Sequence, residues 1–175
     1  MIKTIAKLIL ALNGNVQKGQ IAAGFAWGLL LGLVPAGNFF WIILIVVSFF
    51  FKHNHASKLL VMALIKIFMP LISSLTDALG WEILHIESLQ PLFTTLYNMP
   101  FVPFTRFNNT LVAGGLVGGI VLWLPVFFLV LVLVPLYRNT IAPKIGNAKI
   151  VKVIAKIIAK IPFVSQITKA VTHGN

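Results

Sequence analysis

The stretch of sequence that decides the fold runs from residue 21 to residue 51 and reads IAAGFAWGLLLGLVPAGNFFWIILIVVSFFF. It contains no Lys, Arg, Asp, Glu or His. As one straight helix it would be about 46 Å long, whereas the hydrocarbon core of a bilayer is about 30 Å thick. Near its middle, the Pro-Ala-Gly-Asn sequence of residues 35–38 is a strong turn signal that leaves two legs of about 21 Å each. This geometry predicts a short or re-entrant hairpin.

A second uncharged window covers residues 107–137 and also contains a proline near its middle. No Gly-Asn follows this proline, so we expect a kinked single helix there. The two windows share a spacing at an offset of 90 residues, in which Gly24, Gly28 and Pro35 correspond to Gly114, Gly118 and Pro125. One hypothesis is an internal repeat around a functional site. The alternative is convergence, because Gly and Pro are common in membrane helices.

The composition of the 175-residue chain supports a membrane protein. Hydrophobic residues make up 59% and charged residues 10%, whereas an average soluble domain carries about 25% charged residues. So few charges cannot cover a water-facing surface, which argues against a soluble enzyme and a disordered basic tail. The net charge of +11 does not indicate a nucleic-acid binder, because a basic face would need a soluble body to carry it. We therefore expect no nucleic-acid partner.

The glycines of both windows lie at helical spacing. Gly24, Gly28 and Gly32 form one stripe, and Gly114 and Gly118 belong to a second. A stripe without side chains lets another helix approach to backbone contact, which is a main way in which membrane helices associate. The pattern favours helix packing within the chain. The alternative is an interface with a partner or with a second copy.

The positions of the charges predict the orientation in the membrane. Lysines stand at both ends of the first window, whereas residues 67–105 contain no Lys or Arg and hold all three acids, Asp77, Glu82 and Glu87. Seven basic residues follow Tyr137. By the positive-inside rule, we expect a multi-pass protein of the bacterial inner (cytoplasmic) membrane with both termini in the cytoplasm and the acidic segment outside.

These observations predict an all-α, polytopic membrane fold with short or broken helices and basic amphipathic interfacial helices at both ends. We expect an N-terminal interfacial helix over 1–16, a membrane domain over 17–144 and a basic amphipathic tail over 145–175. Within the membrane domain we expect a hairpin over 17–55, a helix over 56–80 that bends or ends at Pro70, an external segment over 81–106 and a kinked helix over 107–138.

One lysine, Lys66, falls inside a predicted membrane helix. An intramembrane lysine is costly, so it should snorkel to the interface, face a polar cavity or pair with an acid. Snorkelling is the favoured interpretation. The alternative is an intramembrane polar site of Lys66 with Asp77 and Glu82. Asp77, eleven residues on, is too far along the same helix to be a direct partner, so Glu82 or Glu87 would have to fold back.

The tail has the clearest amphipathic pattern of the chain. Four lysines share one helix face and isoleucines and valines fill the other, the lysines being Lys149, Lys152, Lys156 and Lys160. Such a helix lies in the headgroup plane and attracts anionic phospholipids. The alternative is a helix that binds a partner protein.

No pattern of catalytic, cofactor-binding or metal-binding residues emerges. Glu82 and His85 have the spacing of a carboxylate-bridged metal pair, but a di-metal site needs a second copy of this pair and two further carboxylates, and only Asp77 and Glu87 remain. His53 and His55 would face different sides of a helix, and a loop role beside the membrane surface is the favoured interpretation. We therefore expect a protein that is not an enzyme and has no cofactor.

The residues Gln20–Pro35, QIAAGFAWGLLLGLVP, followed by Gly37-Asn38, resemble the opening of the bacterial family known as domain of unknown function 2062, in its stand-alone subgroup. Lys52–Asn54 match the family's polar loop, and Pro70 with Gly80 match its later helix break, although Met69 stands where that family usually has Asn. The resemblance spans residues 18–144. It implies a small partner of a much larger envelope protein that serves lipid or outer-membrane traffic, and it supplies no catalytic residues.

The expected function is a non-enzymatic inner-membrane anchor or subunit of a bacterial cell-envelope complex, in lipid or envelope-component transport. Its partners would be the bilayer, anionic phospholipids and a larger envelope protein or a second copy. The alternative is a small transporter or channel built on two broken-helix repeats. The two differ at Lys66, because an anchor with a snorkelling lysine should tolerate Lys66→Met, whereas a transporter with a charged path should not.

Overall fold

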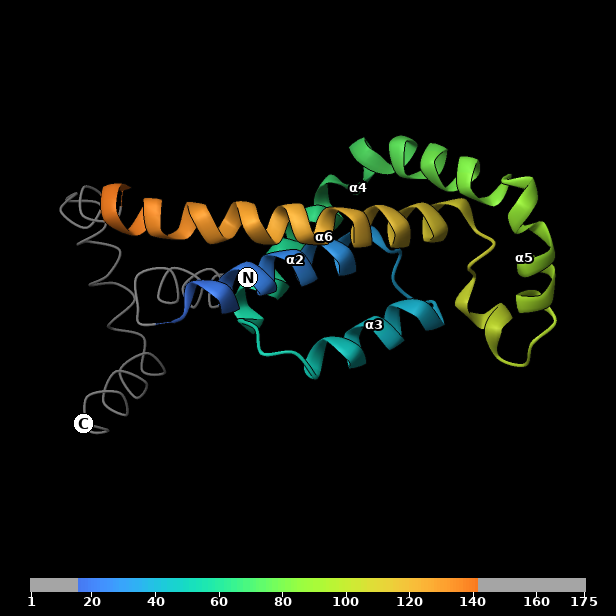
Figure 1. Ribbon diagram of the computed structural model, residues 1–175, viewed down its shortest axis with the longest axis horizontal. Helices are drawn as coiled ribbons and strands as arrows, with labels where there is room; N and C mark the ends of the chain where they lie inside the picture. Colours follow the sequence, from blue (N-terminus) through green and yellow to red (C-terminus); the bar gives the residue numbers. More distant parts are fainter. Residues whose placement is uncertain (1–15, 142–175) are drawn as a thin grey trace. The chain divides into compact units, whose positions relative to one another are not determined.

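The structure, a computed structural model, describes residues 16–141 (Figure 1). The expected N-terminal interfacial helix and the four tail lysines lie outside the described residues. Within them the chain is helical and has no strand, so the prediction of an all-α fold is confirmed for this part. The α-helices are α2 (Lys18–Leu33), α3 (Phe39–Phe49), α4 (His55–Leu84), α5 (Gln90–Tyr97) and α6 (Thr110–Leu136). Short 3₁₀ helices η1 (Glu87–Leu89) and η2 (Val102–Thr105) flank α5, and a π-helical turn η3 (Tyr137–Ile141) follows α6.

The first uncharged window folds as the two helices α2 and α3, joined at residues 34–38. Gly37 has a φ of +86°, in the left-handed region that glycine adopts without steric cost. Asn38 is the N-cap of α3, and its side-chain Oδ1 accepts a hydrogen bond of 2.8 Å from the Trp41 backbone N–H. The local sequence therefore explains both why α2 ends and where α3 begins.

Pro70 and Pro125 do not interrupt their helices. The helix α4 contains Pro70 and continues to Leu84, beyond the expected end at residue 80, and α6 runs without a break through Pro125. An internal proline removes one backbone hydrogen bond, but no left-handed glycine follows either of these prolines to reverse the chain. The two windows thus differ, one as a helix pair and one as a single helix, and only the first contains a break.

Close contacts between glycines and their neighbours hold α2 against α4. A Cβ atom added to Gly28 would lie 2.6 Å from the Lys58 carbonyl oxygen, and one added to Gly32 would lie 2.6 Å from the Ile65 Cβ. Gly24 meets the start of α4 in the same way, at the carbonyl oxygen of Asn54. Residue numbers rise together along the two helices, so α2 and α4 run parallel.

The helix α6 packs against α2 and α4 through glycines of its first turns. A Cβ atom at Gly115 would lie 2.6 Å from the Leu33 carbonyl oxygen, and one at Gly119 would lie 2.5 Å from the Leu30 Cδ1. Gly114 faces Gly80 of α4 backbone to backbone. Further along, Val130 and Val134 cluster with residues at the start of α2, so α6 is antiparallel to α2.

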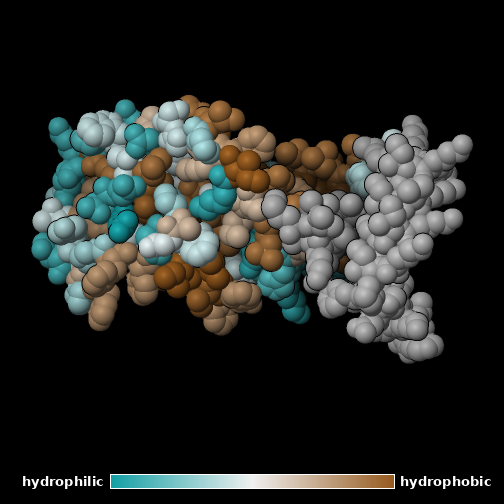
Figure 2. All heavy atoms as spheres, turned by 180° about the vertical axis from the view of Figure 1, so that it is seen from behind, coloured by the Kyte–Doolittle hydropathy of each residue, from teal (hydrophilic) through white to brown (hydrophobic). Residues whose placement is uncertain are grey.

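The outer surface of these helices is apolar. The side chains of Leu71 and Leu75 on α4 are 75% and 74% exposed, and that of Val132 on α6 is 66% exposed. Figure 2 shows hydrophobic residues along the helices and hydrophilic ones gathered toward the end that carries α5. Two helices, His55–Leu84 and Thr110–Thr140, are long and apolar enough to cross a membrane. Small residues inside and large apolar residues outside are the arrangement expected where lipid is the solvent.

Candidate functional site

Three side chains satisfy backbone carbonyl groups at the break between α2 and α3. Where a helix ends, its last carbonyl groups lose their intrahelical donors. The Trp41 indole Nε1–H donates to the Leu31 carbonyl oxygen at 3.0 Å, and the Asn38 side-chain amide donates to the Pro35 carbonyl oxygen at 2.6 Å. The Lys66 ammonium, from α4, donates to the Val34 carbonyl oxygen at 2.5 Å. A break at membrane depth is tolerated when neighbouring protein groups satisfy the backbone in this way.

The structure gives Lys66 a role that the sequence did not reveal. Its positive charge lies at the C-terminal end of α2, where the helix dipole is negative. The structure does not bring it together with Asp77 and Glu82. Because α4 is one continuous helix, these acids lie 11 and 16 residues further along it, about 16 and 24 Å away. Asp77 instead accepts a hydrogen bond from the Thr110 hydroxyl at the start of α6.

The turn between α3 and α4 is a second polar cluster and is tied to the start of α2. Asn54, the N-cap of α4, accepts hydrogen bonds through Oδ1 from the Ser57 backbone N–H at 2.9 Å and from the Ser57 hydroxyl at 3.0 Å. The backbone N–H of Asn54 donates to the Gln20 carbonyl oxygen at 2.8 Å. These contacts hold the beginning of the longest described helix against the beginning of α2.

Lys58, in the first turn of α4, is buried. The residue is 4% exposed. Its Nζ donates to the Ser48 hydroxyl at 2.9 Å and lies 4.5 Å from the centroid of the Phe49 ring. The Ser48 hydroxyl in turn donates to the Ile45 carbonyl oxygen at 2.7 Å. Neither the hydroxyl nor the aromatic face carries a formal negative charge, so these contacts do not neutralise the ammonium group.

His53 lies in the same cluster and is 7% exposed. Its Nδ1 is 2.8 Å from the Phe51 carbonyl oxygen, and its buried Nε2 has no hydrogen-bond partner among the described residues. The ring centroids of His53 and His55 are 4.5 Å apart. The two rings therefore do not face opposite sides of a helix as expected, because His53 precedes α4. Burial lowers the pKa of His53, and the nearby charges of Lys58 and His55 lower it further against the opposing hydrogen bond to Phe51.

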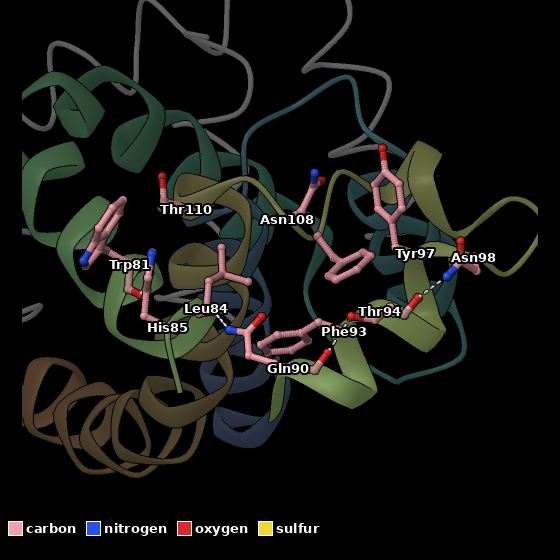
Figure 3. A pocket seen from close by; sticks show the side chains of 11 residues that line it. Trp81, Leu84, His85, Gln90, Phe93, Thr94, Tyr97, Asn98, Asn108 and Thr110 are labelled. Carbon is pink, nitrogen blue, oxygen red and sulfur yellow. Dashed lines mark hydrogen bonds between the residues drawn. The ribbon is translucent and has the colours of Figure 1, made fainter. Parts of the chain in front are cut away.

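A groove of about 560 Å³ lies where the end of α4, the helix α5 and the start of α6 meet (Figure 3). The groove is lined by Trp81, Leu84, His85, Gln90, Phe93, Thr94, Tyr97, Asn98, Phe107, Asn108 and Thr110. None of these residues is Lys, Arg, Asp or Glu. The rings of Trp81 and His85 stack with centroids 3.8 Å apart at one side, and Tyr97 and Asn98 lie at the other. The groove thus combines aromatic faces with amide and hydroxyl groups.

Hydrogen bonds along α5 hold the polar wall of this groove. The Gln90 side-chain amide donates to the Leu84 carbonyl oxygen at 2.5 Å, which links α5 to the end of α4. The Thr94 hydroxyl donates to the Gln90 carbonyl oxygen at 2.9 Å, and the Asn98 amide donates to the Thr94 carbonyl oxygen at 2.9 Å. The groove is built from residues 81–98 of the segment that the sequence indicated only as external and from the first residues of the expected kinked helix, Phe107, Asn108 and Thr110. No sequence signal could have found it, because it depends on how α5 folds back between α4 and α6.

Residues 16–141 contain no group of three or more His, Asp or Glu side chains that could hold a metal ion. Glu82 and His85, the pair with metal-ligand spacing, lie at the end of α4, where the His85 Nδ1 is 2.8 Å from the Trp81 carbonyl oxygen. The sites of this part of the chain therefore offer hydrogen bonding, aromatic contact and positive charge.

These features define a class of helical protein. Two of its helices are able to span a membrane, and glycines allow close packing between its helices. The chain belongs to the family domain of unknown function 2062, described as an uncharacterized protein conserved in bacteria, and the match covers residues 3–141. An uncharacterized protein of Treponema pallidum (strain Nichols) is 35% identical over 150 residues, which cover 86% of this chain and 93% of that protein. No solved structure matches. The resemblance to this family is thus confirmed, and the match begins earlier than the expected residue 18.

Proposed function

We propose that this protein is a non-enzymatic anchor or subunit of a bacterial cell-envelope complex, embedded in the inner membrane. The observation that carries the proposal is the core of α2, α4 and α6. Glycines of all three helices bring the backbones into contact, and the side chains on the outside are apolar. Such a core is suited to hold a fixed shape in lipid and to present its polar end to a partner.

Helix lengths support a topology in which α2 and α3 form a re-entrant hairpin. With 16 and 11 residues, the two helices are about 24 and 16 Å long, less than the hydrocarbon thickness of about 30 Å. The helices α4 and α6, with 30 and 27 residues, are about 45 and 40 Å long. In the proposed arrangement α4 crosses outward and α6 returns, so both termini are cytoplasmic and α5 is external, in agreement with the lysine distribution.

The contacts of Lys66 favour an anchor over a small transporter. Its charge is used to satisfy a carbonyl group at the end of α2, which leaves it no part in a polar path across the membrane. The transporter alternative also needs a break in each window, and α6 is continuous. Attraction of the tail lysines to anionic lipid remains a prediction and would strengthen attachment to the inner leaflet.

The groove beside α5 is the proposed contact with a larger envelope protein, in a complex that moves lipid or another envelope component. It lies at the hydrophilic end of the helices, where a partner outside the membrane can reach it. Aromatic residues are enriched in protein interfaces, and charged residues are depleted at the interface core. The groove could instead contact a second copy of this chain, and the experiment below distinguishes this arrangement from the envelope protein.

The experiment is cross-linking in cells followed by purification of the full chain in detergent. Asn108→Trp fills the groove, whereas Ser88→Trp places the same side chain at an exposed position outside it. We expect one large protein in stoichiometric amount with the wild type and with Ser88→Trp, and its loss with Asn108→Trp at unchanged expression. Recovery of the chain alone, or of further copies of it, would refute the envelope-partner proposal.

A further inference from the structure

The buried charge of Lys58 is not neutralised by the rest of the described chain. A lysine ammonium has three N–H donors, and the contacts in the structure provide one hydroxyl acceptor and one aromatic face. On the same helix, Asp77 and Glu82 are 19 and 24 residues further along, about 28 and 36 Å away. Burying a charge without an opposite charge is costly. The site therefore calls for an anion from outside the chain.

His53 is an independent observation that points to a ligand at the same turn. It is more than nine-tenths buried, and its Nε2 has no partner. A carbonyl oxygen only accepts hydrogen bonds, so Nδ1, which faces the Phe51 carbonyl oxygen, carries a proton. When His53 takes up a second proton, Nε2–H becomes a donor that an anionic oxygen can accept. The ring lies against His55, the first residue of α4, where the helix dipole also favours negative charge.

The surroundings of this turn are those of a lipid headgroup rather than of a dissolved ion. Phe50, at the end of α3, is 83% exposed, and the neighbouring Phe49 and Phe51 are also exposed. The exposed Lys52 follows them directly. Aromatic side chains beside basic groups provide an apolar surface for acyl chains next to a polar surface for a phosphate. Anionic lipids are abundant in the cytoplasmic leaflet, the side on which the proposed topology places this turn.

From these contacts we infer that the α3–α4 turn binds the phosphate group of an anionic phospholipid, with Lys58 and His53 as donors and with the acyl chains beside Phe49 and Phe50. The inference rests on the proposed membrane embedding but not on the envelope partner. It is separate from the tail lysines, because it lies on a different segment and depends on buried groups. Binding is linked to proton uptake at His53, so the affinity rises as the pH falls.

The test uses the full chain in detergent with Lys149, Lys152, Lys156 and Lys160 all replaced by Gln, so that the lysine face of the predicted tail helix contributes no charge. Phosphatidylglycerol and phosphatidylcholine are added separately, and bound lipid is counted by native mass spectrometry. We expect one retained phosphatidylglycerol, held at least about tenfold more tightly than phosphatidylcholine, as for a charge-assisted hydrogen bond. Lys58→Met should remove this preference, whereas Lys58→Arg and the exposed-site control Lys18→Met should keep it.

His53→Phe is a second variant, which fills the ring volume without Nε2, and should weaken phosphatidylglycerol binding and remove its pH dependence. Thermal unfolding verifies that each variant is folded. Equal retention of the two lipids, or an unchanged preference in folded Lys58→Met, would overturn the inference. Displacement of phosphatidylglycerol by millimolar inorganic phosphate would also overturn it, because the site would then recognise the free anion. Recovery of the envelope partner is measured with the same variants. If the partner is still recovered, the lipid inference alone has failed and the proposed function stands.

Discussion

Replacing Lys66 by Met tests whether this lysine caps the broken helix. Met keeps the length and the apolar stem of the side chain, so the substitution removes the ammonium group and little else. The lost contact is the hydrogen bond of 2.5 Å from Nζ to the Val34 carbonyl oxygen at the end of α2. The sequence alone predicts that an anchor tolerates this change, because a snorkelling lysine makes no such contact. The structure reverses that expectation.

The size of the effect follows from two opposing contributions. A hydrogen bond from a charged donor contributes about 1.5–3 kcal/mol, and the charge at a helix C-terminus contributes about 0.3–1 kcal/mol more. Against this, the half-buried ammonium no longer has to be desolvated when it is replaced by Met. We expect a net loss of about 1–2 kcal/mol in the free energy of unfolding. Lys18→Met, at an exposed position of α2, should change it by less than about 0.5 kcal/mol.

The assay is denaturant unfolding of the detergent-solubilised protein, followed by tryptophan fluorescence, together with recovery of the envelope partner. Lys66→Met should lower the unfolding midpoint and reduce partner recovery in the same proportion. Equal midpoints for Lys66→Met and Lys18→Met would refute the capping argument. Loss of biological function by Lys66→Met with normal expression, stability and partner recovery would instead favour the transporter alternative, in which the charge itself is needed.

Three further predictions test the core, the topology and the pH dependence. Overpacking typically costs about 1–3 kcal/mol, and Gly28→Leu should lower the free energy of unfolding by more than this, because even a Cβ would lie 2.6 Å from the Lys58 carbonyl oxygen. The control is Gly19→Leu, since a Cβ at Gly19 meets nothing within 4 Å. Equal unfolding midpoints for the two variants would contradict the packing. In intact cells, Ser88→Cys should react with a membrane-impermeant thiol reagent and Ser165→Cys should not, and the opposite pattern would rule out the proposed topology. Because the pKa of His53 is lowered below 6.5 in the folded state, unfolding binds protons below that pH, so stability should be fully present above pH 6.5 and should fall as the pH drops below it. His53→Phe should flatten this part of the stability profile measured between pH 7.5 and 5, and a slope equal to that of the wild type would show that another group is responsible.

The amino-acid sequence by itself determined those features that depend on neighbouring residues. The charge-poor composition required an apolar outer surface, and two described helices have the length and apolar character to span a membrane. The break in the first window follows from Pro35 and from a glycine with positive φ, and Asn38 and Asn54 begin the next helices as N-caps. Each of these results comes from backbone conformation and hydrogen bonding over a few residues, which local sequence largely specifies.

Only the tertiary structure decided what the polar side chains do. Lys66 contacts a carbonyl group 32 residues earlier, and Asp77 accepts a hydrogen bond from a residue 33 positions later. Lys58 donates a hydrogen bond to the hydroxyl of Ser48, ten residues earlier on α3. The groove of α5 likewise exists only because segments from α4 to α6 meet. Such contacts depend on which faces of distant helices are brought together, and the spacing of residues along one chain carries no information about the carbonyl group, ring or hydroxyl that will lie opposite.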